Sequence, residues 1–176
     1  SYIQKDLIDF IDPREVDLHN KFLIRLAMQS GELLNIHSIS KSLSIQRKKV
    51  DEYLNILEHT FVTKRIYPFH KNFQKEITKT PKLFFLDLGI RNYILNDFRD
   101  FSLRTDIGHL FENLFLIEIL AKDFHGLNRI NFWRTINGTE IDFVVQGEKD
   151  RVAYELKWAK KNEIKPAIMI KLLYLY

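Results

Sequence analysis

The sequence predicts an α+β chain in which a winged helix-turn-helix precedes a second, strand-rich domain. Apolar residues recur at helical spacing in three successive segments between His19 and Thr60. Two short apolar segments with strand character follow, joined by a polar stretch. Three helices followed by a two-stranded hairpin is the element order of a winged helix. Further along, one long apolar helix precedes three strand-length segments, which indicates a separate domain.

Composition excludes several classes of protein. The chain has 176 residues, a formal net charge of +4 and no cysteine, so disulfides, thiolate zinc sites and cysteine nucleophiles are absent. Hydrophobic residues make up 45% of the chain, enough for a packed core. No apolar run is long enough to span a bilayer and no signal peptide is present. We therefore expect a cytoplasmic protein with no membrane partner.

Three parts are expected along the chain. An acidic segment occupies residues 1–17, with a short helix that ends near Pro13. The winged-helix domain occupies residues 18–100 and the second domain residues 101–176. Because the first residues begin in the middle of a pattern, we expect the chain to be a fragment of something longer.

The helices of the first half are expected from local signals. The first begins near His19 and ends at Gly31, and a short second helix follows. The third begins after Ser44, a residue type favoured at N-caps. Its buried stripe consists of Val50, Tyr53, Leu54 and Leu57.

Basic residues are concentrated between Lys41 and Lys82, in the third helix and the following hairpin. Lysine and arginine in the first turn of a helix oppose the helix dipole, which favours a functional reason for them. The functional interpretation is contact with DNA phosphates, and the alternative is a solvated face that packs beside another module. The candidate nucleic-acid-binding residues are Gln46, Arg47, Lys48, Lys49, Lys64 and Arg65.

Glu112 lies within the apolar helix "GHLFENLFLIEIL", where its neighbours on the same face are apolar or glycine. Burial of an unpaired carboxylate there would lower the stability of the fold by an amount on the order of several kcal/mol, so a cation is expected to pair with it. The alternative is that Glu112 reaches the helix edge and bonds an arginine of the connector before the helix. Glu118 is a weaker candidate, because Lys122 is an ordinary partner one turn away.

The strands "TEIDFVVQ" and "RVAYELKWA" carry three further ionisable residues. If Gly147 pairs with Asp150 across a tight turn, Asp142 lies opposite Glu155, on one face of the hairpin. Lys157 lies two residues beyond Glu155 and shares that face.

Two opposed carboxylates repel each other, and a divalent cation between them would remove the repulsion. Oxygen ligands select Mg²⁺, Mn²⁺ or Ca²⁺ rather than zinc. The candidate metal ligands are Glu112, Asp142 and Glu155. Lys157 can neutralise one carboxylate, orient the attacking water or stabilise a charged phosphorane. The alternative is a surface salt bridge between Lys157 and Glu155 on an exposed sheet face.

A helix glutamate, a strand aspartate and then Glu-x-Lys is the order of residues in PD-(D/E)xK nucleases. Most of the chain, including "VDEYLNILEHTFV", "PKLFFLDLGIRNYIL", "GTEIDFVV" and "YELKWAK", resembles the C-terminal region of bacterial and archaeal AAA+ superfamily ATPases. That resemblance implies a winged helix followed by a restriction-endonuclease-like domain, with catalytic residues Glu112, Asp142, Glu155 and Lys157. It also implies an N-terminal AAA+ module as a partner. Because such nuclease cores usually continue into a further helix and strands after Glu-x-Lys, we expect this domain to be either truncated at its C-terminus or atypical in its last elements.

Three functions remain open at this point. The leading one is a DNA-directed module with Mg²⁺- or Mn²⁺-dependent phosphodiester hydrolysis. The others are a non-catalytic DNA-binding or regulatory module and a protein-docking domain of the same ATPase. No G-x-x-x-x-G-K-[ST] motif occurs, so ATP is expected only in the absent module. The histidines assigned no role are His37, His70, His109 and His125.

Overall fold

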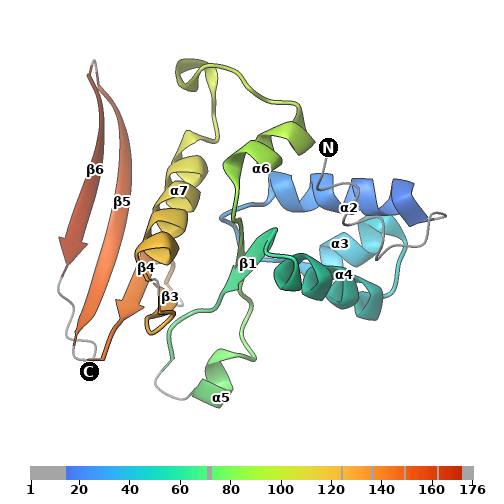
Figure 1. Cartoon of the computed structure of the whole chain (residues 1–176), viewed down its shortest axis with the longest axis horizontal. Helices are drawn as coiled ribbons and strands as arrows, with labels where there is room; N and C mark the ends of the chain where they lie inside the picture. The colour runs from blue at the N-terminus through green and yellow to red at the C-terminus, as the bar shows by residue number, and fades with distance from the viewer. Residues whose placement is uncertain are drawn as a thin grey trace.

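The computed structural model describes residues 15–70, 73–123, 125–135, 137–148, 150–161 and 163–171, with side chains as far as Trp158. Most of the predicted acidic segment, residues 1–14, lies outside the described residues. The chain forms helices on one side, a four-stranded sheet on the other, and the long helix α7 between them (Figure 1). The fold is therefore α+β, as the sequence predicts.

Three helices open the described part of the chain: α2 (Val16–Met28), α3 (Ile36–Leu43) and α4 (Arg47–His59). The Asn35 side chain caps α3 by accepting a hydrogen bond from the Ser38 backbone N–H. Ser44, predicted as the N-cap of α4, instead ends α3 in the left-handed conformation with φ 55°. Gln46 is the N-cap residue of α4. The Ser44 prediction was wrong because a short polar residue suits either end of such a tight turn.

A small antiparallel sheet follows, made of β1 (Thr63–Ile66) and β2 (Lys82–Phe85), with the short helix α5 (Phe73–Glu76) in the connection. Thr63 pairs with Phe85 and Ile66 with Lys82. The helix α6 (Leu88–Leu95) comes next, capped by the Asp87 side chain. The predicted order of three helices and a two-stranded hairpin is confirmed.

The second half contains a 3₁₀ turn η2 (Phe101–Leu103), the helix α7 (Ile107–Lys122) and four strands. The strands β3 (Arg129–Arg134), β4 (Glu140–Gln146), β5 (Arg151–Lys161) and β6 (Glu163–Lys171) form an antiparallel sheet in sequence order. The tight turn predicted after β4 is confirmed, since the Gly147 N–H donates to the Asp150 carbonyl at 2.9 Å. Where the resemblance implies a further helix, the backbone continues as β6.

Two apolar cores hold the molecule together. The first lies among α2, α3 and α4 and includes Phe22, Leu26, Leu54 and Phe85. The second joins the two halves: its buried residues are Ile66, Phe84, Leu116, Phe132, Phe143 and Leu156. Because β2 contributes Leu83 and Phe85 to the first core and Phe84 to the second, residues on the two sides of the predicted boundary near residue 100 pack together. The boundary at residue 17 also falls inside α2.

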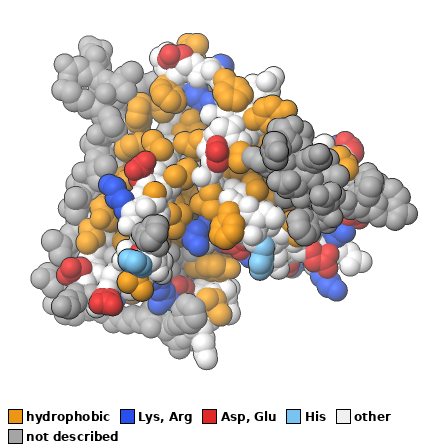
Figure 2. All heavy atoms as spheres, viewed as in Figure 1, with side chains coloured by type: hydrophobic (Ala, Val, Ile, Leu, Met, Phe, Trp, Pro, Cys, Tyr) orange, Lys and Arg blue, Asp and Glu red, His pale blue; other side chains and the backbone are white. Residues whose placement is uncertain are grey.

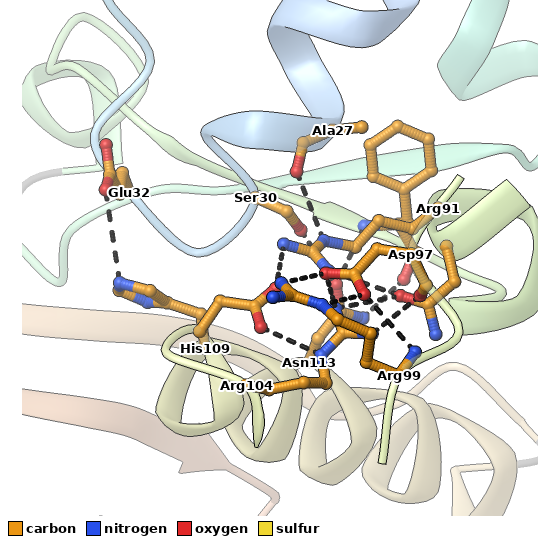
Figure 3. A network of polar contacts seen from close by, with 12 residues as sticks. Ala27, Ser30, Glu32, Arg91, Asp97, Arg99, Arg104, His109 and Asn113 are labelled. Carbon is orange, nitrogen blue, oxygen red and sulfur yellow. Dashed lines mark hydrogen bonds and ion pairs between the residues drawn. The ribbon is translucent and has the colours of Figure 1, made fainter. Parts of the chain in front are cut away.

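Polar contacts reinforce the junction of the two halves (Figure 3). Arg91 and Arg104 are 3% and 2% exposed, and both bind Asp106 just before α7. The Arg91 guanidinium also donates to the Ala27 carbonyl at the end of α2. The same network holds the pKa of Asp106 at about 2, chiefly through the Arg104 hydrogen bonds. The start of α7 is thus fixed to α2 and α6 by buried charge pairs.

The connector between α6 and α7 buries one arginine but exposes Arg99, Asp100 and its large apolar side chains. Arg104 is buried, whereas Phe98, Phe101 and Leu103 are exposed. Apolar side chains also occupy much of the face drawn in Figure 2, with charged groups between them. Among the described residues, no helix has the length and apolarity needed to cross a bilayer.

Candidate functional site

Four carboxylates and two lysines gather where α7 crosses the ends of β2, β4 and β5. Glu112 comes from α7, Glu140 and Asp142 from β4, and Glu155 from β5. The electrostatic effect of Asp142 on Glu112, and of Glu155 on Asp142, places the predicted carboxylates within one interacting cluster. We call these four carboxylates, with Lys82 and Lys157, the carboxylate cluster.

Glu112 is desolvated, as its apolar surroundings predict. Its side chain is 18% exposed, and its Oε2 atom is buried without a hydrogen-bond partner among the described residues. Burial raises the pKa of Glu112 to about 7, with Lys82 opposing that rise and Asp142 and Glu140 adding to it. A large part of the Glu112 population is therefore protonated at neutral pH.

The cation beside Glu112 is Lys82, which the sequence interpretation assigned to the exposed basic region. Lys82 is 5% exposed on β2, and its Nζ atom lies 3.7 Å from Glu112 Oε2 and contacts Glu140 Oε1. It also lies over the Phe132 ring, 5.5 Å from the centroid. The predicted alternative, a connector arginine, is wrong, because Arg91 and Arg104 bind Asp106 and Asp97 instead. The sequence feature that could have identified Lys82 as a buried cation is its position at the start of the otherwise apolar strand "KLFF".

Asp142 stands at the end of the β4–β5 ladder. The predicted register is confirmed from Phe143–Tyr154 to Gln146–Arg151, and the ladder stops before Asp142 and Glu155. Asp142 Oδ2 accepts the Leu156 backbone N–H at 2.7 Å. Burial raises the pKa of Asp142, and that hydrogen bond lowers it. The Asp142 side chain thus accepts a backbone hydrogen bond just beyond the last residue pair of the ladder, and its carboxylate remains poorly solvated.

Glu155 and Lys157 form a close ion pair on β5. Lys157 Nζ lies 2.7 Å from Glu155 Oε1, and the Lys157 side chain is 59% exposed. The hydrogen bond to Glu155 raises the pKa of Lys157, so its ammonium is retained well above neutral pH. This pair is the contact expected from the salt-bridge alternative, but here it adjoins two buried carboxylates.

The donor set fits a magnesium or manganese ion held by two carboxylates. With all groups ionised, the four carboxylates exceed Lys82, Lys157 and Arg134, which lies 3.7 Å from Glu140, by one negative charge. Magnesium usually retains several waters and takes only one or two protein carboxylates, with substrate phosphates completing its shell. In the described part of the chain, no three His, Asp or Glu side chains are grouped closely enough to hold a metal, so the predicted three-ligand set is not assembled. Asp142 and Glu155 remain as the candidate pair.

His109 adjoins the cluster, although the sequence interpretation assigned it no role. Its Nδ1 atom lies 3.9 Å from Glu112 Oε1, and its Nε2 atom lies 4.0 Å from Glu32 in the first half (Figure 3). A Cβ added at Gly31 would lie 3.0 Å from the His109 ring, so the loop after α2 packs directly against it.

The candidate DNA-binding residues divide into two groups. Gln46, Arg47 and Lys48 are exposed at the start of α4. Arg65 binds Glu58 and Asn55. Lys49 binds Glu15 at 2.8 Å, and Lys64 on β1 is half-buried. The start of α4 is therefore the more accessible part of this basic surface.

Comparison with known proteins gives two family matches. Residues 1–100 match the family described as Domain of unknown function (DUF8612), and residues 107–175 match Domain of unknown function (DUF4143). Two relatives are Uncharacterized protein Mb2031c of Mycobacterium bovis and Uncharacterized protein Rv2008c of Mycobacterium tuberculosis, each 25% identical over 134 residues. Those matches cover 75% of this chain and 30% of each relative. No solved structure matches the chain.

Proposed function

The chain belongs to the family described as Domain of unknown function (DUF8612), and we propose that it is a DNA-directed part of a longer protein, with a carboxylate site for phosphodiester hydrolysis. The observation that carries this proposal is the carboxylate cluster, in which the partly buried Glu112 and Asp142 both have raised pKa values. Strongly perturbed carboxylates beside lysines are typical of catalytic sites.

In this proposal the two halves of the chain have different roles. The first half contacts phosphates through the exposed basic start of α4, as a winged helix would. The second half supplies the PD-(D/E)xK-like residues. We propose an ATPase module as the partner in the longer protein because the sequence resembles the C-terminal region of AAA+ superfamily ATPases.

In the proposed reaction, Asp142 and Glu155 would hold the cation, and the partly buried Glu112 lies in the same cluster. A bound magnesium or manganese ion would supply an activated water and neutralise charge on the scissile phosphate. The Lys157 ammonium, held by Glu155, orients toward the phosphate and stabilises the negative charge that develops on its oxygens. The Leu156 N–H fixes the Asp142 carboxylate in one orientation.

One observation favours a second function, a non-catalytic DNA-binding or regulatory module. Lys82 already neutralises Glu112 and Glu140, as a structural cation would. In that case DNA binding would depend on salt but not on divalent cations.

Plasmid cleavage separates the two functions. The chain would be incubated with supercoiled plasmid and Mg²⁺ or Mn²⁺, beside Asp142→Asn and Lys157→Ala. Asp142→Asn keeps an oxygen acceptor for the Leu156 N–H, so the fold is expected to persist. We expect nicking by the parent and a loss of about 100-fold or more in both variants, the size typical of a lost charge-stabilising group.

The matched controls are Asp150→Asn and Lys122→Ala, which change exposed residues outside the cluster. Both should nick plasmid at the parent rate. Equal traces of nicking from the parent and both cluster variants would indicate a contaminant. Tight DNA binding without cleavage would favour the non-catalytic module.

A further inference from the structure

Three large apolar side chains lie exposed on the connector between α6 and α7. Phe98, Phe101 and Leu103 are 67%, 60% and 65% exposed, and we call them the connector patch. The loop that carries them lies at the upper edge of the view in Figure 1, above α6 and α7. Apolar side chains of this size, exposed close together, are typical of a surface that another protein covers.

Polar contacts hold this loop in one conformation. The guanidinium of the buried Arg104 donates a hydrogen bond to the Asp97 carbonyl at 2.7 Å. The Asp100 side chain accepts the Ser102 backbone N–H at 2.9 Å. A loop that is already ordered loses little conformational entropy when a partner covers it. The same contacts keep the connector patch at the surface, so it does not fold back onto its own chain.

A cavity with an apolar lining lies between the start of α3 and the segment that leads to β2, and we call it the α3 cavity. Its volume is about 540 Å³, and Leu33, Leu34, Ile36 and Pro81 supply its apolar lining. Cavities of about 300–1,000 Å³ enclose drug-sized ligands, which are larger than two phenyl rings. The segment that leads to β2 lies in the lower part of Figure 1, away from the connector. The α3 cavity therefore has room for the rings of the connector patch, but only for those of another copy.

The charges beside the two surfaces are complementary. Near the connector patch, Arg99 is paired with Asp97, which leaves the exposed Asp100 as an additional acid. Lys79 and His37 are exposed at the α3 cavity, and none of the described residues that line this cavity is acidic. An acidic apolar loop and a basic apolar cavity attract each other, whereas two copies of either surface do not.

We propose that the connector patch of one copy of this chain docks into the α3 cavity of a second copy, so that copies associate head to tail. The patch and the cavity are different surfaces, so every pair of copies leaves one of each uncovered. Further copies add to these ends until a ring closes or a filament extends. Neither surface includes the carboxylate cluster, so this association needs no divalent ion and goes beyond the proposed function.

Sedimentation velocity of the purified chain over a concentration series tests the proposal. We expect the parent to form dimers and larger species as its concentration rises. Phe98→Ser combined with Phe101→Ser removes the rings of the connector patch. Leu33→Glu combined with Lys79→Glu places acids in the α3 cavity, where they repel Asp100. Each double variant should raise the dissociation constant about tenfold or more, as the loss of central apolar contacts does.

The substituted side chains are all exposed, so both double variants should fold like the parent, which circular dichroism checks. The matched control is Phe61→Asn, because Phe61 is 78% exposed and belongs to neither surface. Its backbone has φ 56°, a conformation that asparagine tolerates well. Phe61→Asn should associate like the parent.

A mixture of the two double variants distinguishes a head-to-tail contact from a two-fold symmetric one. The first variant keeps its cavity and the second keeps its patch. An equimolar mixture should therefore form dimers that contain one copy of each variant, and no larger species. A two-fold contact would use one surface of each copy twice, so a mixture with a damaged surface on every contact would stay monomeric.

Dimers in the mixture, with neither double variant associating alone, support the proposal. A parent that stays monomeric up to about 1 mM overturns it, since even a millimolar contact would be detected there. Parent-like association of either double variant also overturns it, as does a mixture that stays monomeric. Equal weakening by Phe61→Asn would show that loss of any exposed ring is sufficient, and would overturn the specific contact. Plasmid cleavage is unaffected by any of these results.

Discussion

Glu112 places a partly buried carboxylate on the helix α7 between Leu110 and Asn113, and Lys82 compensates that charge only in part. The desolvation of Glu112 exceeds the effect of Lys82, so burial raises the pKa of Glu112 from 4.5 to about 7. A carboxylate retained at such a cost suggests a use beyond folding.

The first prediction concerns the pH dependence of stability. Between about pH 4.5 and 7, the folded chain holds the Glu112 proton and the unfolded chain has lost it, so the free energy of unfolding falls as pH rises. The loss should be on the order of 2–3 kcal/mol above pH 7. Glu112→Gln removes this dependence, so the variant should be more stable than the parent at pH 8 and similar to it at pH 5. Urea unfolding in EDTA at both values measures the difference.

Glu118→Gln is the control, because it changes an exposed glutamate on the same helix. Its stability should follow the parent at both pH values. If Glu112→Gln destabilised the chain at pH 8, the Lys82–Glu112 contact would be worth more than the desolvation it opposes.

The candidate site shows which residues a sequence can identify. Glu112, Asp142, Glu155 and Lys157 follow from an apolar helix face and a hairpin register, both of which depend on local spacing. Lys82 was missed because its burial depends on α7, which arrives later in the chain and covers β2. Glu140, the second residue that Lys82 binds, was missed for the same reason.

At the scale of single elements, α4 and β1 present basic residues of unequal availability. Arg47 and Lys48 are exposed in the first turn of α4, whereas Arg65 on β1 is bound by Glu58. A phosphate would have to displace Glu58 before it could bind Arg65, which reduces any gain from the contact.

The second prediction compares these residues in DNA binding. Arg47→Ala combined with Lys48→Ala should weaken binding to any duplex and lower the slope of log affinity against log salt by about 2, one unit per lost phosphate contact. Arg65→Ala should leave the slope within about half a unit of the parent. Fluorescence anisotropy over a salt series measures both slopes.

The surface control for this series is Lys122→Ala, on a different element. A slope change from Arg65→Ala as large as that from the double variant would mean that β1, rather than the start of α4, contacts the phosphates. Loss of affinity in none of the variants would remove DNA as the partner of this surface.

Element order was easier to predict than element ends. Helical spacing and alternating strands identified the helices α2, α3, α4 and α7 and the strands β1 to β5, because burial of one face imposes those periods. The N-cap of α4 was misplaced by two residues, because Ser44 suits the end of α3 equally well. The strand β6 was not predicted, since a short apolar segment carries no distinction between strand and buried helix.

At the scale of the whole molecule, the two family matches cover regions that share one core. Ile66 and Phe84 from the first half pack with Leu116, Phe132 and Phe143 from the second. Asn113, fully buried on α7, accepts hydrogen bonds from Ser30 and from the Phe85 N–H, and donates to the Phe85 carbonyl. Separation of the halves would break all of these contacts.

The third prediction is that residues 1–100 do not form the native structure alone. The fragment would expose Ile66 and Phe84, which are 2% and 0% exposed in the whole chain. It should bind the dye ANS and unfold over a broad range, whereas the whole chain should show one sharp transition. A sharp transition and no dye binding by the fragment would contradict the shared core.

Asn113 also has a consequence for how the chain is made. Its amide occupies the hydrogen-bonding positions of Phe85 that a neighbouring strand would otherwise take, so α7 shields this edge of β2 from other chains. On the ribosome, Phe85 emerges before Asn113, and synthesis of the intervening segment takes roughly one to six seconds at 5–20 residues per second. During that interval nascent chains on one polysome carry open strand edges, and a chaperone that holds extended segments would be most useful to this protein then.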